Sequence, residues 1–411
     1  MPARPRAARR PFVGRRVVLG VTGGIAAYKS IQLARDLTIA GAEVDVVITR
    51  GGLEFVQPLP FEALTGRPVR TLSHAPGEAV THIRLAREAS LVVVAPATAN
   101  FLARAAAGMA DDLLTSILLA TEAPVLLVPA MNDRMYAHAQ MQRNLQRLGE
   151  LGYTLIEPAL GPLAWGEGEG RGRMPEPEEI FEHCARALEP PNPLSGRRVL
   201  VTAGPTREPL DPVRFLGNRS SGRMGYALAR AAWRRGAEVT LISGPTALEP
   251  PTGVRLVRVE SATEMRDAVA EELPSADALI MAAAVADFRP ARAVPQKIKK
   301  GEAPPEIPLE ANDDILLVTR NRRRLGSVVV GFALETESAV ENGREKLQKK
   351  GLDLLVVNDA TEPGAGFEVD TNRVVILDRD GNEADLPLLS KDEVADEILD
   401  RVAAYLERAT P

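Results

Sequence analysis

The chain opens with a short apolar run that ends in a glycine turn. Residues Val17–Val21 are continuously apolar, and Thr22-Gly23-Gly24 follows them. From Ile25 to Ala40 the apolar residues recur at helical spacing, and Gly41 ends this helix. The segment Ala42–Thr49 is the next apolar run. The order strand, glycine turn, helix, strand predicts a parallel unit with a right-handed crossover.

The same alternation continues through the first half. A buried strand is predicted at Leu91–Ala95, ending at Pro96, and an Ala/Leu-rich helix at residues 99–120. Another strand is predicted at Pro124–Val128, ending at Pro129-Ala130-Met131-Asn132. Strands that alternate with helices predict a doubly wound α/β domain.

The second half repeats the opening pattern after a linker. Residues 189–197 are rich in proline and lack periodicity, which predicts a stiff linker. Beyond it, Arg198–Gly204 resembles the first strand and its glycine, and the helix Tyr226–Arg235 leads to a strand at residues 236–243. A long polar loop, residues 205–223, separates strand from helix. Further buried strands are predicted at residues 278–286, 327–331 and 354–357.

The predicted fold class is therefore α/β, with two Rossmann-like doubly wound domains over residues 17–188 and 198–408. Residues 1–16 hold six arginines and no acid, which predicts a disordered basic tail.

Composition narrows the class of protein. The chain has 411 residues, of which 45% are hydrophobic and 26% charged, as in globular proteins, and its net charge of −5 argues against a general nucleic-acid or membrane-surface binder. No apolar run reaches the ~18–20 residues that span a bilayer. One cysteine, Cys184, cannot form an internal disulfide, which favours a reducing cytoplasm.

Three candidate residues or pairs in the first half are compatible with two interpretations each. Gly23-Gly24 could let a phosphate approach a helix N-terminus, or could be a tight turn with a positive φ. Neither G-x-G-x-x-G nor a P-loop is present, which favours a mononucleotide over NAD. His82 is a candidate acid/base or a histidine at a helix start. Asn132 follows a strand end, where it could bind a ligand or cap a helix.

Four further segments carry charge beside glycine or strand ends. Residues 166–174 are predicted to be a flap or a flexible linker. The glycine-, arginine- and asparagine-rich segments 204–214 and 218–225 favour anion binding. The basic cluster Lys297–Lys300 and the strand-end Asp287 are compatible with a solvated face or with Mg²⁺ and a triphosphate.

Together these segments resemble one known family, the bifunctional phosphopantothenoylcysteine decarboxylase/phosphopantothenate–cysteine ligases of coenzyme A biosynthesis. The resemblance covers residues 15 to 408, and its motifs occur in the family's order. In the first half they are Val21–Lys29, Pro96–Asn100, Pro129–Asn132 with Met135, and Gly170–Met174. In the second half they are Thr202–Gly225, Ala284–Asp287, Lys297–Lys300, Gly331–Ala333 with Glu335-Thr336, and Asn358-Asp359.

The resemblance implies that the first domain is flavodoxin-like and binds FMN between the subunits of a trimer. It implies that His82 acts as the active-site base and that Asn132 binds the carboxylate that leaves as CO₂. The implied cofactor-binding residues are Gly23, Gly24, Ile25, Pro96, Ala97, Thr98, Asn100 and Met131.

For the second domain, the resemblance implies a dimer that ligates cysteine to 4'-phosphopantothenate, using CTP with Mg²⁺ through an acyl-cytidylate. Asn218 and Arg214 would handle the acyl intermediate, Lys297 would act in catalysis, and Asp287 would hold the metal. The implied nucleotide-binding residues are Met281, Ala282, Ala283, Asp287, Lys297, Asp313, Asp314, Ile315, Leu316, Phe332, Lys346 and Lys350.

The sequence departs from the family pattern at one position. Trp165 stands where the family has a flap cysteine that donates a proton, and an indole N–H does not ionise usefully. Three outcomes follow: another acid or water donates the proton, decarboxylation stops at the enethiol, or the first domain is a scaffold beside an active ligase. A non-enzymatic flavin-binding regulator is the alternative class, and release of pyrophosphate distinguishes it from a ligase.

Overall fold

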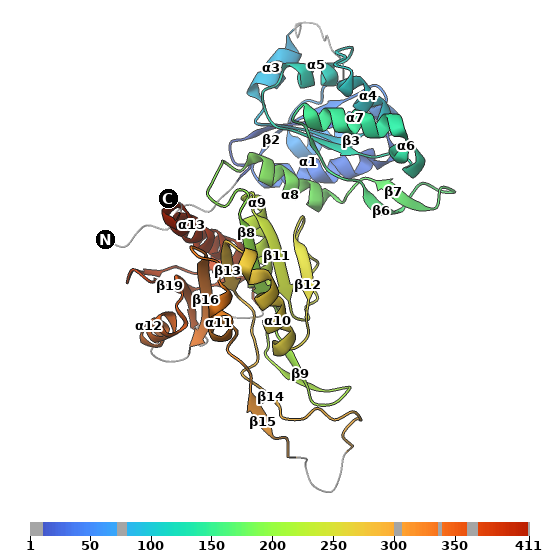
Figure 1. The fold of residues 1–411 in the computed structure, drawn as a ribbon. Coiled ribbons are helices and arrows are strands. Elements are labelled where there is room, and N and C mark those ends of the chain that lie inside the picture. The colour runs from blue at the N-terminus through green and yellow to red at the C-terminus, as the bar shows by residue number, and fades with distance from the viewer. Residues whose placement is uncertain (1–10, 72–79, 300–305, 336–338, 360–368, 410–411) are drawn as a thin grey trace. The chain divides into compact units, whose positions relative to one another are not determined.

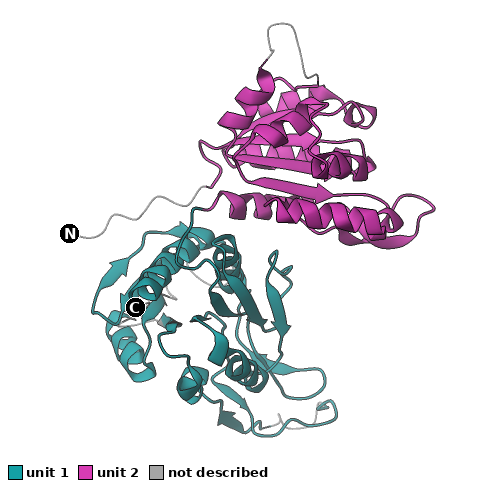
Figure 2. Ribbon diagram, turned by 45° about the horizontal axis from the view of Figure 1, so that its top comes forward, with its two compact units in different colours: residues 1–9, 190–411 teal, residues 10–189 magenta. Residues whose placement is uncertain are grey.

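The computed structural model describes residues 11–71, 80–299, 306–335, 339–359 and 369–409. It consists of two compact units, residues 10–189 and residues 190–411, which we call the first and the second domain (Figure 2). The division falls inside the segment predicted to be a linker. Both domains have the doubly wound architecture that the sequence predicts.

The first domain is built on a five-stranded parallel sheet with the order β2-β1-β3-β4-β5 (Figure 1). Val17 and Leu19 pack into one core and Val18 into the other, so the central strand is buried on both faces. Burial on both faces explains why these strands are apolar without alternation. The strands are β1 (Arg16–Val21), β2 (Glu43–Ile48), β3 (Leu91–Ala97), β4 (Val125–Pro129) and β5 (Thr154–Leu155).

Helices cover both faces of this sheet. One core contains Leu33, Phe61 and Ile180, and therefore joins the sheet to α1 (Lys29–Ile39), α2 (Pro58–Thr65) and α8 (Pro177–Leu188). The opposite core joins it to α3 (Thr81–Glu88), α4 (Ala99–Ala106), α5 (Leu113–Ala120) and α7 (Ala139–Glu150). The smaller elements are η1 (Ile25–Tyr28), η2 (Gly52–Glu54), α6 (Asp133–Ala137) and the hairpin of β6 (Ala159–Pro162) with β7 (Glu169–Arg173).

The single helix predicted at residues 99–120 is wrong, because the structure has two helices there. Gly108 adopts a left-handed conformation with a φ of 69° after α4 ends. Asp112 then starts α5 with a capping box, in which its side chain accepts from the Thr115 backbone N–H at 2.8 Å. A residue with positive φ cannot continue an α-helix, and a capping box begins a new one.

The second domain has an eight-stranded sheet with the order β12-β11-β8-β13-β16-β17-β19-β20. The strands from β12 to β17 are parallel, and β19 and β20 are antiparallel additions at one edge. The strands are β8 (Arg198–Ala203), β11 (Glu238–Ser243), β12 (Arg255–Arg258), β13 (Ala278–Met281), β16 (Val328–Glu335), β17 (Leu354–Asp359), β19 (Val374–Asp378) and β20 (Glu383–Asp385).

Two helix layers cover this sheet as well. The helices α9 (Arg223–Arg234) and α13 (Lys391–Ala409) share one core with Val199 and Val201. On the other face, α10 (Ala262–Glu272), α11 (Ile315–Val318) and α12 (Ala339–Lys350) share a core with Leu200. Short 3₁₀ turns, η3 (Leu273–Ser275) and η4 (Arg320–Arg322), accompany them.

Two small antiparallel hairpins extend from the second sheet and form what we call the arm. They pair β9 (Arg207–Pro209) with β10 (Phe215–Gly217), and β14 (Phe288–Pro290) with β15 (Leu309–Ala311). A third pair, β18 (Thr371–Asn372) with β21 (Leu389–Ser390), lies before α13. Figure 1 shows β14 and β15 projecting away from the sheet.

The basic tail predicted at residues 1–16 is shorter than expected. Phe12 is only 1% exposed and its ring packs on Phe181 with a centroid distance of 4.7 Å, while Arg16 begins β1. Residues 1–10 lie outside the described part of the chain. The linker predicted at residues 189–197 is also partly docked, since Leu194 is buried in the core of the second domain. Isolated apolar residues in polar segments are hard to recognise as core residues from sequence.

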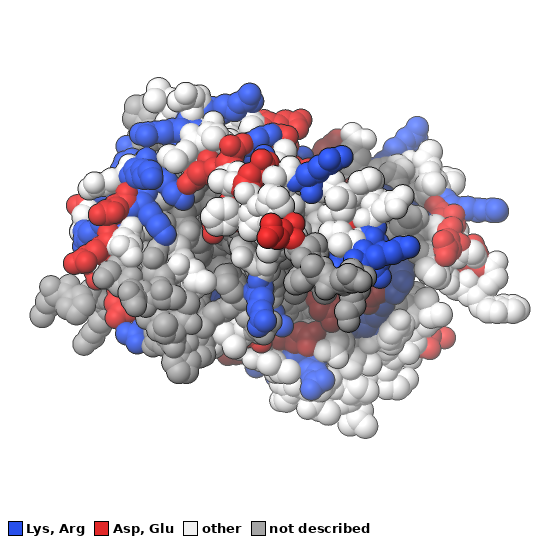
Figure 3. Space-filling model, turned by 90° about the horizontal axis from the view of Figure 1, so that it is seen from below, with Lys and Arg blue, Asp and Glu red and all other residues white. Residues whose placement is uncertain are grey.

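No helix in the described part of the chain is long and apolar enough to cross a membrane. On the face of the molecule drawn in Figure 3, Lys and Arg side chains lie among Asp and Glu side chains rather than in one continuous basic surface.

We expect Arg235→Ala to destabilise the second domain by about 3–5 kcal/mol. Arg235 is 2% exposed, and its guanidinium pairs with Asp396 at 2.9 Å and Asp400 at 3.0 Å, so its loss leaves two partly buried carboxylates without their cation. Urea unfolding followed by the emission of Trp233, which is buried on α9, measures this loss. Arg198→Ala removes an exposed arginine 3.7 Å from Glu238 and is the control, expected to change stability by less than about 0.5 kcal/mol. If both variants lost the same free energy of unfolding, the buried ion pairs of Arg235 would not be important for stability.

Candidate functional sites

The strand order of the first domain reverses between β1 and β3, and the first residues beyond these strands are tied together. The Thr22 hydroxyl donates to the Pro96 carbonyl at 2.8 Å and accepts from the Thr98 backbone N–H at 3.0 Å. Open α/β sheets bind ligands at the carboxyl ends of strands where the order reverses. A ligand-binding site is therefore expected at this point of the first sheet.

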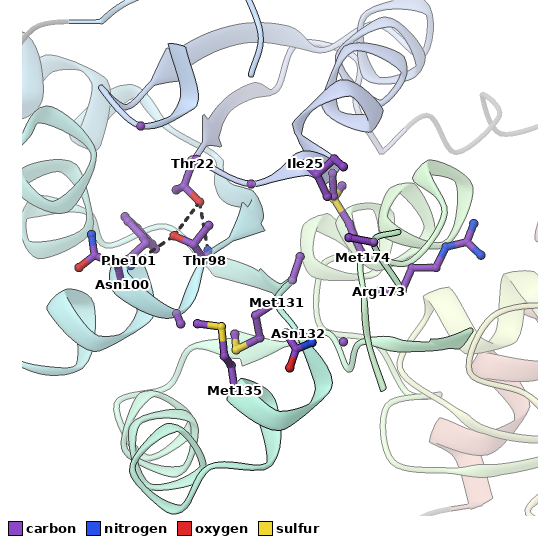
Figure 4. Close-up of a pocket in the computed structure, with 18 of the residues that line it drawn as sticks. Thr22, Ile25, Thr98, Asn100, Phe101, Met131, Asn132, Met135, Arg173 and Met174 are labelled. Carbon is purple, nitrogen blue, oxygen red and sulfur yellow. Dashed lines mark hydrogen bonds between the residues drawn. The ribbon is translucent and has the colours of Figure 1, made fainter. Parts of the chain in front are cut away.

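A cavity of about 850 Å³ opens at this point (Figure 4). Its volume lies in the range of about 300–1,000 Å³ that is typical of cofactor sites. Pro96 and Ala97, which were predicted to bind the cofactor, belong to the buried strand β3 and are not among the residues that line the cavity. The other residues predicted to bind the cofactor line the cavity: Gly23, Gly24, Ile25, Thr98, Asn100 and Met131.

The lining combines an apolar wall with charged groups. Ile25, Met131 and Met135 contribute apolar side chains that surround the space drawn in Figure 4. The cations of the lining include the exposed Arg50 and the buried Lys29, whose ammonium donates to the Met174 carbonyl and to the Glu176 carboxylate, each at 3.0 Å. The beginning of η1 adds backbone N–H groups. A flat apolar ring with a phosphate matches this lining, because helix N-termini and cations bind anions. The residues present therefore fit a flavin mononucleotide.

Close packing, rather than a left-handed turn, explains why position 23 is a glycine. Neither Gly23 nor Gly24 has a positive φ, so the interpretation as a left-handed turn is wrong. A Cβ on Gly23 would lie 2.7 Å from the backbone of Gly51, which follows β2. The close approach of these two backbones forms one wall of the cavity.

Asn132 was predicted either to bind a ligand or to cap a helix, and its position is compatible with both. It lines the cavity, and its Oδ1 caps α6 by accepting from the Arg134 backbone N–H at 2.9 Å. The capping bond fixes the carboxamide, which leaves Nδ2 as the donor available to a ligand. His82 lies on α3, outside the lining of the same chain's cavity.

The residue at the family's cysteine position lies at the turn of the β6–β7 hairpin. Trp165 is fully exposed, while its neighbours Leu163, Ala164 and Glu167 line the cavity. The hairpin therefore forms part of the cavity wall, as predicted for a flap. Cys184 cannot replace the missing thiol, because it is completely buried in α8 and burial raises the pKa of its thiol.

The second domain has a matching cavity where its strand order reverses between β8 and β13. The volume of this cavity is about 510 Å³. It is lined by Asn218 and by every residue predicted to bind the nucleotide except Lys297, namely Met281, Ala282, Ala283, Asp287, Asp313, Asp314, Ile315, Leu316, Phe332, Lys346 and Lys350.

Hydrogen bonds hold this lining in place. Asn218 Nδ2 donates to the carbonyls of Ala284 at 3.2 Å and Val285 at 3.1 Å, which fixes the polar loop against the end of β13. The Asp314 side chain caps α11, and its carboxylate lies 2.9 Å from the Lys350 ammonium. The cavity thus carries lysines close to a capped helix start, an arrangement suited to phosphates.

Two predicted catalytic residues lie outside this lining. The Arg214 guanidinium pairs with Asp211 at 2.5 Å and donates to the Ile298 carbonyl at 2.7 Å. This pairing and three backbone N–H groups hold the pKa of Asp211 well below its usual range. Lys297, next to Ile298, is exposed on the arm. In a single chain Arg214 therefore organises the arm rather than the cavity.

Asp287 lines the cavity, but the described residues contain no group of three His, Cys, Asp or Glu side chains that could hold a metal by themselves. Mg²⁺ is usually held by one or two carboxylates and the phosphates of its nucleotide. One carboxylate beside a triphosphate therefore fits Mg²⁺, whereas a protein-only metal centre does not.

Sequence reasoning located only part of one wall of the second cavity, because Arg223 lies in the segment 218–225 predicted to bind an anion, whereas Lys391 and Asn372 were missed. Arg223 and Lys391 line it as the first residues of α9 and α13, together with the buried Asn372. Ser390 and Glu393 form a capping box that marks the start of α13 in the sequence. That signal places the helix but does not say which cavity its first residue faces.

Comparison with known proteins matches each of the two domains to a family. Residues 5–189 match the family described as Flavoprotein, and residues 194–406 match the DNA/pantothenate metabolism flavoprotein C-terminal domain. The chain is 50% identical to the "Coenzyme A biosynthesis bifunctional protein CoaBC" of Mycobacterium tuberculosis, over 96% of this chain and 97% of that protein. It is 45% identical to the protein of the same name from Bacillus subtilis, over 95% and 97%. A crystal structure of the C-terminal domain of a CoaBC protein is 43% identical, with a TM-score of 0.46, and the match covers 53% of this chain and 99% of that one.

We expect Cys184 to be inert in the native protein. Its thiol is 0% exposed and burial raises its pKa, so little reactive thiolate forms near neutral pH. Titration with a chromogenic disulfide reagent should detect no thiol in the folded chain and one thiol in denaturant. Rapid labelling without denaturant would show that Cys184 can reach solvent and would reopen its role as an acid.

Proposed function

Because this chain belongs to the family of bifunctional coenzyme A biosynthesis proteins, we propose that its second domain joins cysteine to 4'-phosphopantothenate and its first domain decarboxylates the product. The observation that carries this proposal is the pair of cavities, one at the reversal point of each sheet. Most of the lining of both cavities comes from the motifs that relate the chain to the family. A purely regulatory flavin-binding module would have no use for a second cavity lined by lysines beside a strand-end aspartate.

In the second domain, the substrate carboxylate attacks the α-phosphorus of CTP, and pyrophosphate leaves. The cysteine amine then attacks the acyl carbon, a proton is lost from nitrogen, and CMP leaves. Lys346 and Lys350 are placed to stabilise the negative charge that gathers as pyrophosphate departs. Mg²⁺ would be held by Asp287 and the phosphate oxygens. Phe332, which lies within strand β16 and lines the cavity, offers an aromatic edge or face to the base.

We propose that the second domain dimerises through the arm. Four large apolar side chains there are between 51% and 61% exposed, and a second copy would cover them: Val213, Phe215, Phe288 and Leu309. The same contact brings Lys297 of the arm next to a cavity, which accounts for its catalytic role although it lies outside the cavity of its own chain.

In the first domain, FMN supplies the two-electron oxidation of the substrate's cysteine thiol and the later reduction of the decarboxylated product. The apolar wall of Ile25, Met131 and Met135 holds a flat ring and excludes water from it. Asn132 Nδ2 donates to the substrate carboxylate until CO₂ leaves. Assembly of three first domains places His82 of one copy at the cavity of the next, where it acts as the base.

The replacement of the flap cysteine by Trp165 affects only the final proton transfer. The thiol of Cys184 is buried, so the proton that accompanies reduction comes from water or from another acid at the cavity. Oxidation and decarboxylation need no group from position 165. The alternative outcome is that the first domain releases the enethiol, which is two hydrogens lighter than phosphopantetheine.

We predict that Lys346→Gln raises the KM for CTP by about 10- to 100-fold, because a charge-assisted contact with phosphate is worth about 1.5–3 kcal/mol. Release of pyrophosphate with phosphopantothenate and cysteine present measures it. Lys349→Gln, an exposed lysine of the same helix outside the cavity, is the matched control. A wild-type chain that makes no phosphopantothenoylcysteine would exclude the ligase activity, and equal effects of both variants would exclude the specific role of Lys346.

We also predict that the wild-type chain converts phosphopantothenoylcysteine to phosphopantetheine, detected by mass spectrometry. Trp165→Cys should raise the fraction of saturated product if proton donation limits the last step, and should leave the rate of CO₂ release unchanged. A product that stays two hydrogens lighter in the wild type and becomes saturated in Trp165→Cys would favour the enethiol outcome. Absence of any CO₂ would contradict the proposed decarboxylase.

A further inference from the structure

Two helices on one face of the second sheet supply much of the predicted nucleotide site. Helix α11 and its cap supply Asp314, Ile315 and Leu316, and α12 supplies Lys346 and Lys350. Both helices pack into the same core on that face. The distance between α11 and α12 therefore sets the shape of this part of the cavity.

Helix α11 is too short to hold its own position. It has four residues, whereas isolated helices shorter than ~12–15 residues are marginal in water. On the cavity side it is tied to α12 by the ion pair of Asp314 with Lys350, at 2.9 Å, but these side chains are 33% and 27% exposed. A phosphate bound in the cavity competes with Asp314 for the Lys350 ammonium. This ion pair alone therefore cannot keep the two helices in place during the reaction.

Arg323 joins the same two helices from behind the cavity. It follows η4 directly and is not among the residues that line the cavity. Its Nη2 donates to the Leu316 carbonyl at 2.7 Å and to the Lys350 carbonyl at 3.2 Å. Its Nη1 donates to the Gly351 carbonyl at 2.7 Å. The last carbonyls of a helix have no partner within the helix, so one guanidinium closes the end of α12 and holds α11 against it.

The side chain of Arg323 is suited to a fixed contact. A guanidinium is planar and presents its donors in a rigid fork. Burial and the neighbouring Arg320 guanidinium lower the pKa of Arg323, and hydrogen bonds away from water are stronger. Its Nε is also buried and donates to no described residue, which costs about 1–3 kcal/mol. An apolar side chain would avoid this cost, but it could not bridge the two helices.

We propose that Arg323 is a positioning residue of the ligase, which fixes α11 against the end of α12 so that the Lys350 ammonium meets the phosphates of the nucleotide. This inference rests on the proposed ligase function and deepens it. When a phosphate draws Lys350 away from Asp314, the bonds from Arg323 remain, because they end on backbone carbonyls. The cavity wall thus keeps its shape while charge moves within it.

The next residue in the sequence to the N-terminal side offers a matched control. Arg322 is an exposed arginine of η4, and its Nη1 donates to the Ala270 carbonyl at 3.3 Å. Ala270 belongs to α10. Replacing Arg322 therefore removes the same charge from the same turn without removing a bond to α11 or α12.

The test measures the rate of pyrophosphate release by the full chain while CTP, phosphopantothenate and cysteine are varied one at a time. Arg323→Met should raise the KM for CTP about tenfold or more, because small misplacements of contacts cost up to about 100-fold. The KM values for the other two substrates should change less than about twofold. Arg323→Lys should give an intermediate KM for CTP, since one nitrogen cannot bridge all three carbonyls. Arg322→Met should change each KM less than about twofold.

Urea unfolding, followed by the emission of Trp233, separates positioning from stability. Lower stability of Arg323→Met with an unchanged KM for CTP would show that Arg323 only closes the end of α12. Equal rises of all three KM values would show a general loosening of the domain. Wild-type kinetics in Arg323→Lys would show that charge, rather than the bridge, matters. If Arg323→Met does not fold, the pattern of KM values in Arg323→Lys decides.

Calorimetric binding of CTP distinguishes failure of the inference from failure of the proposed ligase, because binding needs no turnover. A wild-type chain that binds CTP but releases no pyrophosphate would overturn the ligase, while weaker CTP binding by Arg323→Met would still support the positioning role. An active wild-type chain whose Arg323→Met variant binds CTP equally well would overturn only the inference. A wild-type chain that does not bind CTP would overturn both.

Discussion

Burial of parallel strands on both faces is the constraint from which both cavities arise. A parallel strand needs a crossover, and a strand that is apolar on both sides needs helices on both sides. The chain meets both demands by reversing its winding once in each sheet, between β1 and β3 and between β8 and β13. Consecutive crossovers then leave in opposite directions, so neither helix layer covers the strand ends at the reversal. The polar residues that follow those ends face one shared space.

Close backbone contacts decide how that space is shaped. Gly23 lets the backbone at Gly51 pass beside the first turn, and Gly172 lets β7 pass the carbonyl of Met131, where a Cβ would lie 2.1 Å from the oxygen. Both contacts join segments that are far apart in the sequence. The β6–β7 hairpin is thereby fixed at its base while its turn, which carries Trp165, stays exposed. The residue that departs from the family pattern lies at the part of the wall with the fewest packing constraints.

The sequence predicted the two domains and most strands, because apolar runs bounded by glycine and proline are local signals. The strand predicted at residues 278–286 is too long, since β13 ends at Met281. Prediction failed where the signal was a single residue. Gly108 divides a predicted helix, and Phe12 anchors a segment that its arginines suggested was disordered. The motifs located most of the lining of both cavities through resemblance. They could not show that Arg214 is held by Asp211, or that Lys391 faces the cavity, because both depend on packing between distant elements.

The helix pair α9 and α13 connects the stability of the second domain to the wall of its cavity. The buried Arg235, just past the end of α9, binds Asp396 and Asp400 on α13 and so fixes how the two helices pack along their length. Their starts carry Arg223 and Lys391, which both line the second cavity. Two cations are costly to hold together near a low-dielectric core unless something else holds the helices. The ion pairs around Arg235 provide that support away from the cavity.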